Sequence, residues 1–331
     1  MENQVKAYSL FSLSFWKAYG ITCRPYLFFL SGVSGLVGLS MGKNLELKIF
    51  IPALIAFFFS YGLGQALTDV FQTDTDAISS PYRPLTQGLI TGKQVLGVSL
   101  AGLGLCALVL FLCNPWTIPF TILGVIGLAT YTPFKRRWWG GPFWNSWIVA
   151  LLPVIGYLCL QPEPGIVFYN KALYCVMVSV FFSYAIFVLL GYFKDISADA
   201  QTGYNTLPVV FGWKVSVIVS TIFAIIATLA SLLMLLYIGF YGDGGSVGLA
   251  RYVAILLIGS GIFLEFYSHY GMWKISDEKD SHGPIANCIR AFALLHLGEA
   301  VALKPELAIF SILYYIAFEV VLAIRPERSQ I

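Results

Sequence analysis

Stretches of about 20 apolar residues recur along nearly the whole of this 331-residue chain, and they constrain its fold more than any other feature. The expected spans are 25–42, 49–68, 93–113, 116–132, 145–161, 170–192, 213–239 and 250–272, followed by the apolar stretch 286–324. Charged residues make up only 11% of the chain, about half the share of an ordinary soluble domain. The sequence therefore predicts an all-α, polytopic helical bundle in a membrane.

The stretch 286–324 determines how many spans we expect. Lys304 and Pro305 divide it into two helices, because proline disfavours helical geometry in the residue before it. The first part, 286–303, carries three ionisable side chains and either crosses the bilayer or lies along its surface. We therefore expect nine transmembrane helices, or ten if this part crosses.

These spans form one domain with short flanking segments. We expect an N-terminal cytoplasmic or interfacial segment over 1–24, a single transmembrane domain over 25–324, and a tail over 325–331. Residues 8–17 are typical of a short interfacial helix with aromatic side chains turned toward lipid. Those side chains are Phe11, Phe15 and Trp16.

Lysine and arginine are distributed unequally between the two sets of loops. Twelve occupy the N-terminus and the loops after the second, fourth, sixth and eighth spans: Lys6, Lys17, Arg24, Arg83, Lys93, Lys135, Arg136, Arg137, Lys194, Lys214, Lys274 and Lys279. The opposite loops carry four: Lys43, Lys48, Lys171 and Arg251. Because positive loops stay inside, we expect the first set on the cytoplasmic side of a cytoplasmic membrane.

An acidic cluster follows the second span on this predicted cytoplasmic side. If the span continues as a helix through residue 76, Asp69, Gln72 and Asp76 share one stripe, while Asp74 points elsewhere. Carboxylate and amide oxygens are the hard ligands that Mg²⁺ takes in proteins, usually together with water and substrate phosphates. The cluster is therefore a candidate magnesium site.

A second acidic pair, Asp195 and Asp199, follows the sixth span on the same side. Basic side chains accompany both clusters, namely Arg83 in a Pro-Tyr-Arg-Pro turn and Lys194, with Lys135 in the intervening loop. Two carboxylate clusters with nearby cations suit a diphosphate bound through Mg²⁺. The alternative, solvated charges that cap helix ends, explains a single acidic pair more readily than two matched clusters.

In order and spacing, these motifs resemble the UbiA superfamily of intramembrane prenyltransferases. That family carries NDxxDxxxD, a Pro-x-Arg-Pro turn, YxxxK and DxxxD. The counterparts here, in the same order, are Thr68–Asp76, Pro81–Pro84, Tyr131–Lys135 and Asp195–Asp199. The resemblance covers roughly residues 20–272.

Two positions depart from the family pattern. Thr68 stands where the family has asparagine, and Gln72 stands where it has the middle aspartate. The second change removes one negative charge, although an amide oxygen still coordinates Mg²⁺ or its water. Asp74 compensates for that charge if the helix ends or unwinds there.

The resemblance implies a bundle around a central cavity, open to lipid at the side, in which an allylic carbocation forms when diphosphate leaves. We expect Tyr131 near the cation, Lys135 on the diphosphate, and Asp69 and Asp195 among the residues that hold the metal. Asn145 is a further candidate for lining the cavity. The 16% of aromatic residues suits this chemistry, since aromatic faces stabilise cations.

The sequence thus predicts transfer of an isoprenyl group from a polyprenyl diphosphate to a small aromatic or quinone-type acceptor within the lipid bilayer. A terpene cyclase of the same fold, which needs no acceptor, is one alternative. An ion-coupled transporter is another, although transporter sites normally lie near the bilayer midplane rather than at helix ends. The net charge of +3 and the dispersed basic residues do not indicate a nucleic-acid partner.

Overall fold

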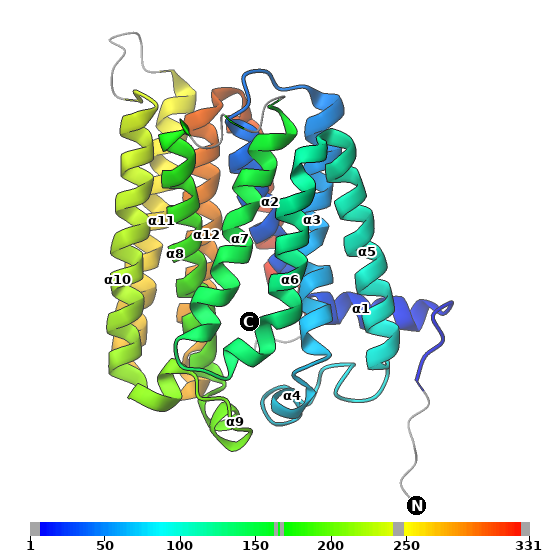
Figure 1. Cartoon of the computed structure of the whole chain (residues 1–331). Coiled ribbons are helices and arrows are strands. Elements are labelled where there is room, and N and C mark those ends of the chain that lie inside the picture. Colours follow the sequence, from blue (N-terminus) through cyan, green and yellow to red (C-terminus); the bar gives the residue numbers. More distant parts are fainter. Residues whose placement is uncertain (1–6, 162–164, 166–168, 241–247, 326–331) are drawn as a thin grey trace, which may run out of the picture.

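The computed structural model describes residues 7–161, 165, 169–240 and 248–325. Within them the chain is helical, and the long helices stand side by side in one bundle (Figure 1). The helices are α1 (Leu13–Cys23), α2 (Phe28–Ser40), α3 (Leu47–Asp69), α4 (Thr73–Ser79), α5 (Gly92–Cys113), α6 (Ile118–Lys135), α7 (Gly140–Cys159), α8 (Lys171–Gly191), α9 (Ile196–Gln201), α10 (Leu207–Tyr237), α11 (Leu249–Lys274), α12 (His282–Leu303) and α13 (Ala308–Ala323). The prediction of an all-α membrane bundle is confirmed.

Nine helical segments of the described part are long and apolar enough to cross a membrane, and the shorter segment Pro25–Ser40, which contains α2, is also apolar. The short helices α4 and α9 lie together at one end of the bundle (Figure 1). Thr75 of α4 and Thr202, just after α9, join them through hydroxyl oxygens 2.8 Å apart. The two acidic clusters therefore lie at the same end, as the sequence predicts.

The course of α12 shows that the stretch 286–303 crosses the bundle. Just before α12 begins, a Glu278 carboxylate oxygen accepts a hydrogen bond from the backbone N–H of Ser197 in α9, over 2.9 Å. Just after it ends, Lys304 Nζ donates to the carbonyl of Gly42 at the opposite end, over 2.7 Å. Helix α13 then runs back to the turn Pro25–Leu27. Counting the shorter segment Pro25–Ser40 with the nine longer ones, the described residues pass ten times between the two ends of the bundle, which corresponds to the larger of the two predicted numbers.

Ionisable side chains inside α12 are paired with groups on neighbouring helices or on α12 itself. His296 is fully buried, with Ser183 Oγ of α8 at 2.8 Å and Glu299 Oε2 at 2.7 Å. Arg290 donates to Glu319 of α13 over 2.8 Å. Because every unpaired polar group in a membrane is costly, these contacts explain how α12 crosses despite its charges. They also hold α12 against α8 and α13.

The N-terminal helix differs from the predicted one over 8–17. Helix α1 begins only at Leu13, and Phe15 is fully buried rather than turned toward lipid. It packs with Tyr19 against Ala66 of α3, because burying the ring against the bundle removes more apolar surface than lying flat would. Phe11 (99% exposed) and Trp16 (51%) do face outward.

Helix α2 packs unusually close to its neighbours because it is rich in glycine. A Cβ added at Gly38 would collide with the backbone carbonyl of Pro153 in α7, and one at Gly156 would collide with the carbonyl of Gly35. Small residues of this kind let membrane helices approach at backbone distance. Helix α2 therefore forms a thin, tightly packed wall inside the bundle.

Gly38→Ala is expected to lower the free energy of unfolding by about 1–3 kcal/mol, because the added methyl group overpacks a backbone contact. Thermal unfolding in detergent measures the effect as a lower Tm. Gly97→Ala in α5 is the matched control, since its added Cβ meets no atom within 4 Å. An unchanged Tm for Gly38→Ala would contradict the close α2–α7 contact.

Candidate active site

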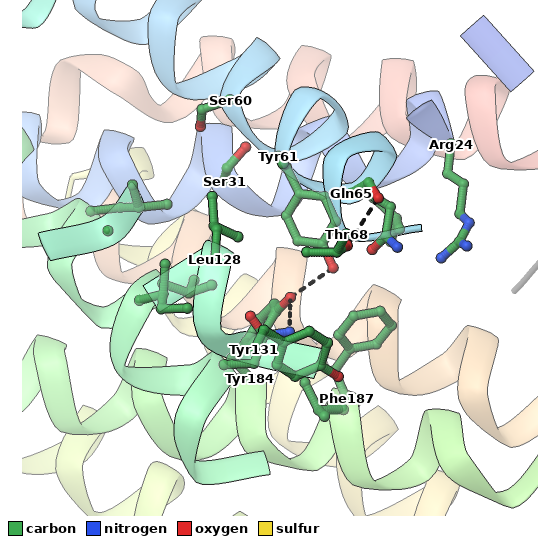
Figure 2. A pocket seen from close by; sticks show the side chains of 18 of the residues that line it. Arg24, Ser31, Ser60, Tyr61, Gln65, Thr68, Leu128, Tyr131, Tyr184 and Phe187 are labelled. Carbon is green, nitrogen blue, oxygen red and sulfur yellow. Dashed lines mark hydrogen bonds between the residues drawn. The ribbon is translucent and has the colours of Figure 1, made fainter. Parts of the chain in front are cut away.

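A cavity of about 220 Å³ opens among α2, α3, α5, α6, α7 and α8 and reaches the end of the bundle that holds α4 and α9. Polar side chains of the predicted motifs line this end: Asp69, Gln72, Asp76, Arg83, Lys135, Lys194 and Asp195. Apolar and aromatic side chains line the remainder. Figure 2 shows part of it, with Arg24 and Gln65 on one side and Tyr131, Tyr184 and Phe187 on the other.

Asp69 is the last residue of α3 and is held by three side chains. Arg24 Nη2 lies 2.8 Å and Gln65 Nε2 lies 2.6 Å from its carboxylate, and Arg83 Nη1 lies 3.9 Å away. Asp69 is almost fully buried, so these contacts stabilise a charge that has little access to water. Arg24 was not predicted as a site residue. The sequence feature that could have identified it is its position: a positive charge directly before the first span, on the same predicted side as both acidic clusters.

The prediction of one helix through residue 76 is wrong. Helix α3 ends at Asp69, and Gln72 has φ −126° and ψ 19°, which is outside the helical region, before α4 begins at Thr73. Threonine and aspartate compete for backbone hydrogen bonds and so favour helix ends over helix interiors. Asp69, Gln72 and Asp76 nevertheless all line the cavity, because the turn redirects the chain across its mouth.

Asp76 and Arg83 form a buried ion pair between α4 and the turn that follows it. Burial raises the pKa of the Asp76 carboxyl above its ordinary value, and the guanidinium of Arg83 opposes that shift. Arg83 thus contacts the first cluster through both Asp76 and Asp69. Its Nε atom is buried and has no hydrogen-bond partner in the described residues, so one donor remains available to a ligand.

Lys135 connects the two acidic clusters. Its ammonium lies 2.9 Å from the amide oxygen of Gln72 and 3.8 Å from Asp199 Oδ1, although these residues come from separate segments of the chain. It also lies over the rings of Tyr192 and Tyr204, at 5.5 and 5.0 Å from their centres. The YxxxK lysine is therefore buried between the two clusters, in contact with the amide of Gln72 and near the carboxylate of Asp199.

The two aspartates of the second cluster have different surroundings. Asp199 is fully buried beside Lys135 and accepts a hydrogen bond from Thr206 over 3.3 Å. Burial raises its pKa to about 7, against the effect of Lys135. Asp195 and Lys194 instead line the cavity, and in the described part of the chain neither forms an ion pair within 4 Å. Their charges are free to meet a ligand.

Asp74, a candidate of the first motif, does not line the cavity. It is half-exposed, with its carboxylate 3.0 Å from Arg136 Nη2 and 3.3 Å from the hydroxyl of Tyr204. As the sequence predicts, it points away from the other members of its cluster. It does not replace the charge that Gln72 lacks.

Tyrosine hydroxyls line the middle of the cavity. Tyr131 Oη lies 3.1 Å from Tyr192 Oη, and Tyr61 Oη lies 2.7 Å from Tyr184 Oη, to which Asn145 donates over 3.5 Å. Tyr131 and Asn145 were predicted, whereas the others lie in apolar spans without a motif. The sequence feature that could have identified them is a tyrosine within an apolar stretch, on a span that leads into one of the acidic clusters.

The residues at the mouth fit a divalent cation that arrives with a phosphate ligand. Asp199 Oδ1 is buried with no hydrogen-bond partner in the described residues, and Asp195 is unpaired. In that same part of the chain, no three histidine, cysteine, aspartate or glutamate side chains lie close enough to hold an ion alone. This matches Mg²⁺, which keeps few protein ligands and takes the remainder from water and phosphates.

Comparison with known proteins identifies the family. The model of the UbiA prenyltransferase family matches residues 27–282, which is most of the chain. The chain belongs to the UbiA prenyltransferase family. It is thus an intramembrane prenyltransferase of the UbiA type, as the motifs predicted, and the transporter alternative does not stand.

Two curated proteins show how much of the sequence such relatives share. The digeranylgeranylglyceryl phosphate synthase of Thermococcus kodakarensis is 26% identical over 273 residues, which cover 81% of this chain and 91% of that protein. The bacteriochlorophyll synthase 33 kDa chain of Cereibacter sphaeroides is 26% identical over 165 residues, or 47% of this chain and 52% of that protein.

Solved structures share the UbiA fold. A UbiA homologue from Archaeoglobus fulgidus bound to DMAPP and Mg²⁺ has a TM-score of 0.61 at 17% identity, over 84% of this chain and 98% of that one. An apo UbiA homologue from Aeropyrum pernix has a TM-score of 0.64 at 18% identity, over 82% and 96%. At such identities the likeness concerns the fold alone.

Proposed function

We propose that this protein transfers an isoprenyl group from a polyprenyl diphosphate to a small aromatic or quinone-type acceptor, with Mg²⁺ at the mouth of the cavity. The observation that supports this most is a single cavity with two kinds of lining. Its mouth carries free and paired charges, and its interior carries apolar and aromatic side chains. A diphosphate and an isoprenoid tail need these two surroundings at once.

Asp69, Gln72, Asp76, Asp195 and Asp199 would hold the magnesium. When bound, Mg²⁺ would neutralise charge on the diphosphate and so make it a better leaving group. Asp69, Asp76 and Asp199 already lie beside arginine or lysine side chains. The diphosphate would take over those basic partners as the carboxylates turn to the metal. Arg83, Lys135 and Lys194 would then bind phosphate oxygens.

The cavity residues would control the fate of the allylic cation once the diphosphate has left. The bond from the allylic carbon to oxygen breaks, and its electron pair leaves with the diphosphate. A ring carbon of the acceptor then forms the new bond to the allylic carbon with a π electron pair. Its C–H bond breaks to restore the ring, and the proton passes to the departing diphosphate or to water at the mouth. The rings of Tyr131 and Tyr192 would stabilise the cation through their faces. Asn145, Tyr61 and Tyr184 would bind polar groups of the acceptor, and the dry, membrane-embedded wall would exclude water from the cation.

This proposal places the mouth, with α4 and α9, on the cytoplasmic side of a cytoplasmic membrane. The support is the excess of lysine and arginine in the loops at this end. The test is to replace the six native cysteines, introduce one cysteine at an exposed position at either end of the bundle, such as Ser197 in α9 or Lys48 at the start of α3, and label it with an impermeant maleimide on intact cells. Labelling of the Ser197 position from outside would contradict the assignment.

The deciding experiment is turnover by purified protein with Mg²⁺ and geranylgeranyl or farnesyl diphosphate. We expect a prenylated product only when an acceptor is added, and no product when EDTA removes the metal. A phenolic acid, a quinone precursor and a geranylgeranylated glyceryl phosphate are the acceptors to compare, the last because relatives are named digeranylgeranylglyceryl phosphate synthases. A cyclic hydrocarbon or terpene alcohol without acceptor would instead support the cyclase alternative.

Gln72→Asp tests the position at which this chain departs from the family. The variant is expected to keep metal-dependent turnover, because a carboxylate oxygen at this position still accepts from Lys135 and adds a hard ligand. Initial rates across a magnesium titration measure it. Complete loss of turnover in a folded variant would show that the neutral amide of Gln72 has a different role.

A further inference from the structure

Two of the six cysteines lie together at the end of the bundle opposite α4 and α9. Cys113 is the last residue of α5 and Cys159 is the last residue of α7, so each helix brings a thiol to this end. The two thiols hydrogen-bond to each other, and the Cys113 thiol also donates to the carbonyl of Ile49 in α3 over 3.9 Å. Two cysteines that are distant in the sequence are therefore neighbours in the fold.

The side chain of Asn114 fixes the ends of α5 and α7 beside each other. Asn114 directly follows Cys113, and its Nδ2 atom donates to the carbonyls of Leu158 and Gln161, over 2.7 Å in each case. These carbonyls lie before and after Cys159 in the chain, so the contacts flank the buried thiol on both sides. A disulfide requires the Cα atoms of its two cysteines to lie within about 7 Å. The contacts of Asn114 bring the two backbones together before any covalent bond joins them.

The cysteine pair lies one helical turn beyond the lining of the cavity. Leu110 of α5 and Ile155 of α7 line the cavity, and the two cysteines follow them on the same helix faces. Helix α5 packs mainly on α3, whereas α7 packs mainly on α8, α2 and α6. Direct packing of α5 on α7 is slight. A covalent bond at this end would therefore join two helices that side-chain packing holds together only weakly.

The two thiols differ in their access to a reagent. Cys113 is half-exposed, while Cys159 is buried. Thiol–disulfide exchange begins at the thiol that a reagent can reach, and it is completed by a second thiol within reach of the first. Cys113 has the first of these positions and Cys159 has the second.

We propose that Cys113 and Cys159 form a disulfide. The Cys113 thiolate attacks a sulfur of a reagent disulfide, such as glutathione disulfide or the active-site disulfide of a thiol oxidase, and one reagent thiol leaves. The Cys159 thiolate then attacks the Cys113 sulfur, and the second reagent thiol leaves. The two cysteines thereby lose two electrons and two protons, and the reagent disulfide is reduced to two thiols.

The compartment at this end of the bundle determines whether the disulfide persists in a cell. Disulfides persist in oxidising compartments and are rare in the cytosol. In the orientation proposed above, this end faces away from the cytoplasm, so the bond is expected to be present in cells. This expectation rests on the proposed orientation, and the pairing itself depends neither on the orientation nor on prenyl transfer.

Purified protein in detergent, incubated with glutathione disulfide or with dithiothreitol, tests the pairing. With oxidant, we expect the thiols that titrate under denaturing conditions to fall from six to four, and a linked Cys113–Cys159 peptide in mass spectra. The oxidised protein should have a Tm about 5 °C higher, because the cross-link restricts the unfolded chain. Six remaining thiols, glutathione that stays on Cys113, or a different linked pair would overturn the proposal.

Cys113→Ser is the test variant and Cys175→Ser is the matched control. Serine keeps the size of the side chain and a donor for the carbonyl of Ile49, but it cannot form a disulfide. Oxidant should therefore leave the Tm of Cys113→Ser unchanged. Cys175 is also half-exposed, near the start of α8, and forms no contact with a second thiol in the described part of the chain. Cys175→Ser should keep the whole increase in Tm, and a loss of that increase would contradict the assignment to Cys113 and Cys159.

Alkylation of intact cells with N-ethylmaleimide before lysis tests the state of the pair in the membrane. We expect Cys113 and Cys159 to be protected from alkylation until dithiothreitol is added. A pair that oxidises in purified protein but is alkylated in cells would overturn the proposed orientation. The pairing and the proposed prenyl transfer would both stand in that case, since neither depends on which side this end faces.

Discussion

Asp76→Asn is expected to lower kcat with geranylgeranyl diphosphate by about 10²–10³-fold, the usual cost of losing one electrostatic partner of the transition state. Asparagine keeps the size of the side chain and one oxygen, but it removes a charge that faces both Arg83 and the cavity mouth. The loss should be smaller at saturating Mg²⁺ if the main defect is weaker metal binding. Initial rates at several magnesium concentrations separate the two effects.

Asp74→Asn is the matched control for this prediction. It makes the same chemical change two residues away, on a carboxylate that is half-exposed and pairs with Arg136 outside the cavity. Its kcat should stay close to that of the wild type. An equal loss of kcat in Asp74→Asn and Asp76→Asn would show that only the total charge of this segment matters for turnover. The position of Asp74 outside the cavity would then make no difference to activity.

Lys135→Met is expected to reduce kcat by a similar factor, about 10²–10³-fold. Methionine is nearly as long as lysine, but it cannot donate to Gln72, to Asp199 or to a phosphate oxygen. Arg137→Met is the control, because Arg137 is exposed in the turn that follows α6, two residues after Lys135. Retained turnover in Lys135→Met would remove this lysine from the proposed mechanism.

Lys135→Met also has a stability effect with a defined pH dependence. Burial already holds the pKa of Asp199 at about 7, and without Lys135 to oppose burial it should rise further. The folded variant then binds a proton that the unfolded chain, with an aspartate pKa of about 4, releases, so stability falls as pH rises through this range. In EDTA, the Tm of the variant should therefore be higher at pH 6 than at pH 8. The opposite slope would contradict the buried environment of Asp199.

Motif spacing predicted most of the polar residues at the mouth, because each motif lies at the end of an even-numbered apolar span and every second span returns the chain to the same face. It did not predict the break after Asp69, since the position of the break depends on local competition for backbone hydrogen bonds rather than on periodicity. Whether Asp74 or Asp76 reaches the cavity depends on how the chain turns between α3 and α4.

The cavity tyrosines are harder to find for another reason. Tyr61 and Tyr184 are 123 residues apart, and their contact exists only because α3 and α8 both border the cavity. In a membrane chain nearly every helix is apolar on several sides, so hydropathy does not distinguish lipid-facing from cavity-facing positions. The same limit applies to α12, whose charges leave open whether it crosses the bilayer or lies on its surface, until their partners on α8 and α13 are known.

The hydrogen bond between Thr75 and Thr202 has a consequence for how a ligand is received. It joins the segments that carry the two acidic clusters, one from each half of the chain, through two side chains of the protein itself. The loss of conformational entropy on bringing these two distant segments together therefore occurs during folding. Ion binding does not have to compensate for it. Weakening this single contact, for example by Thr202→Val, should slow capture of the ion and leave the carboxylates themselves intact.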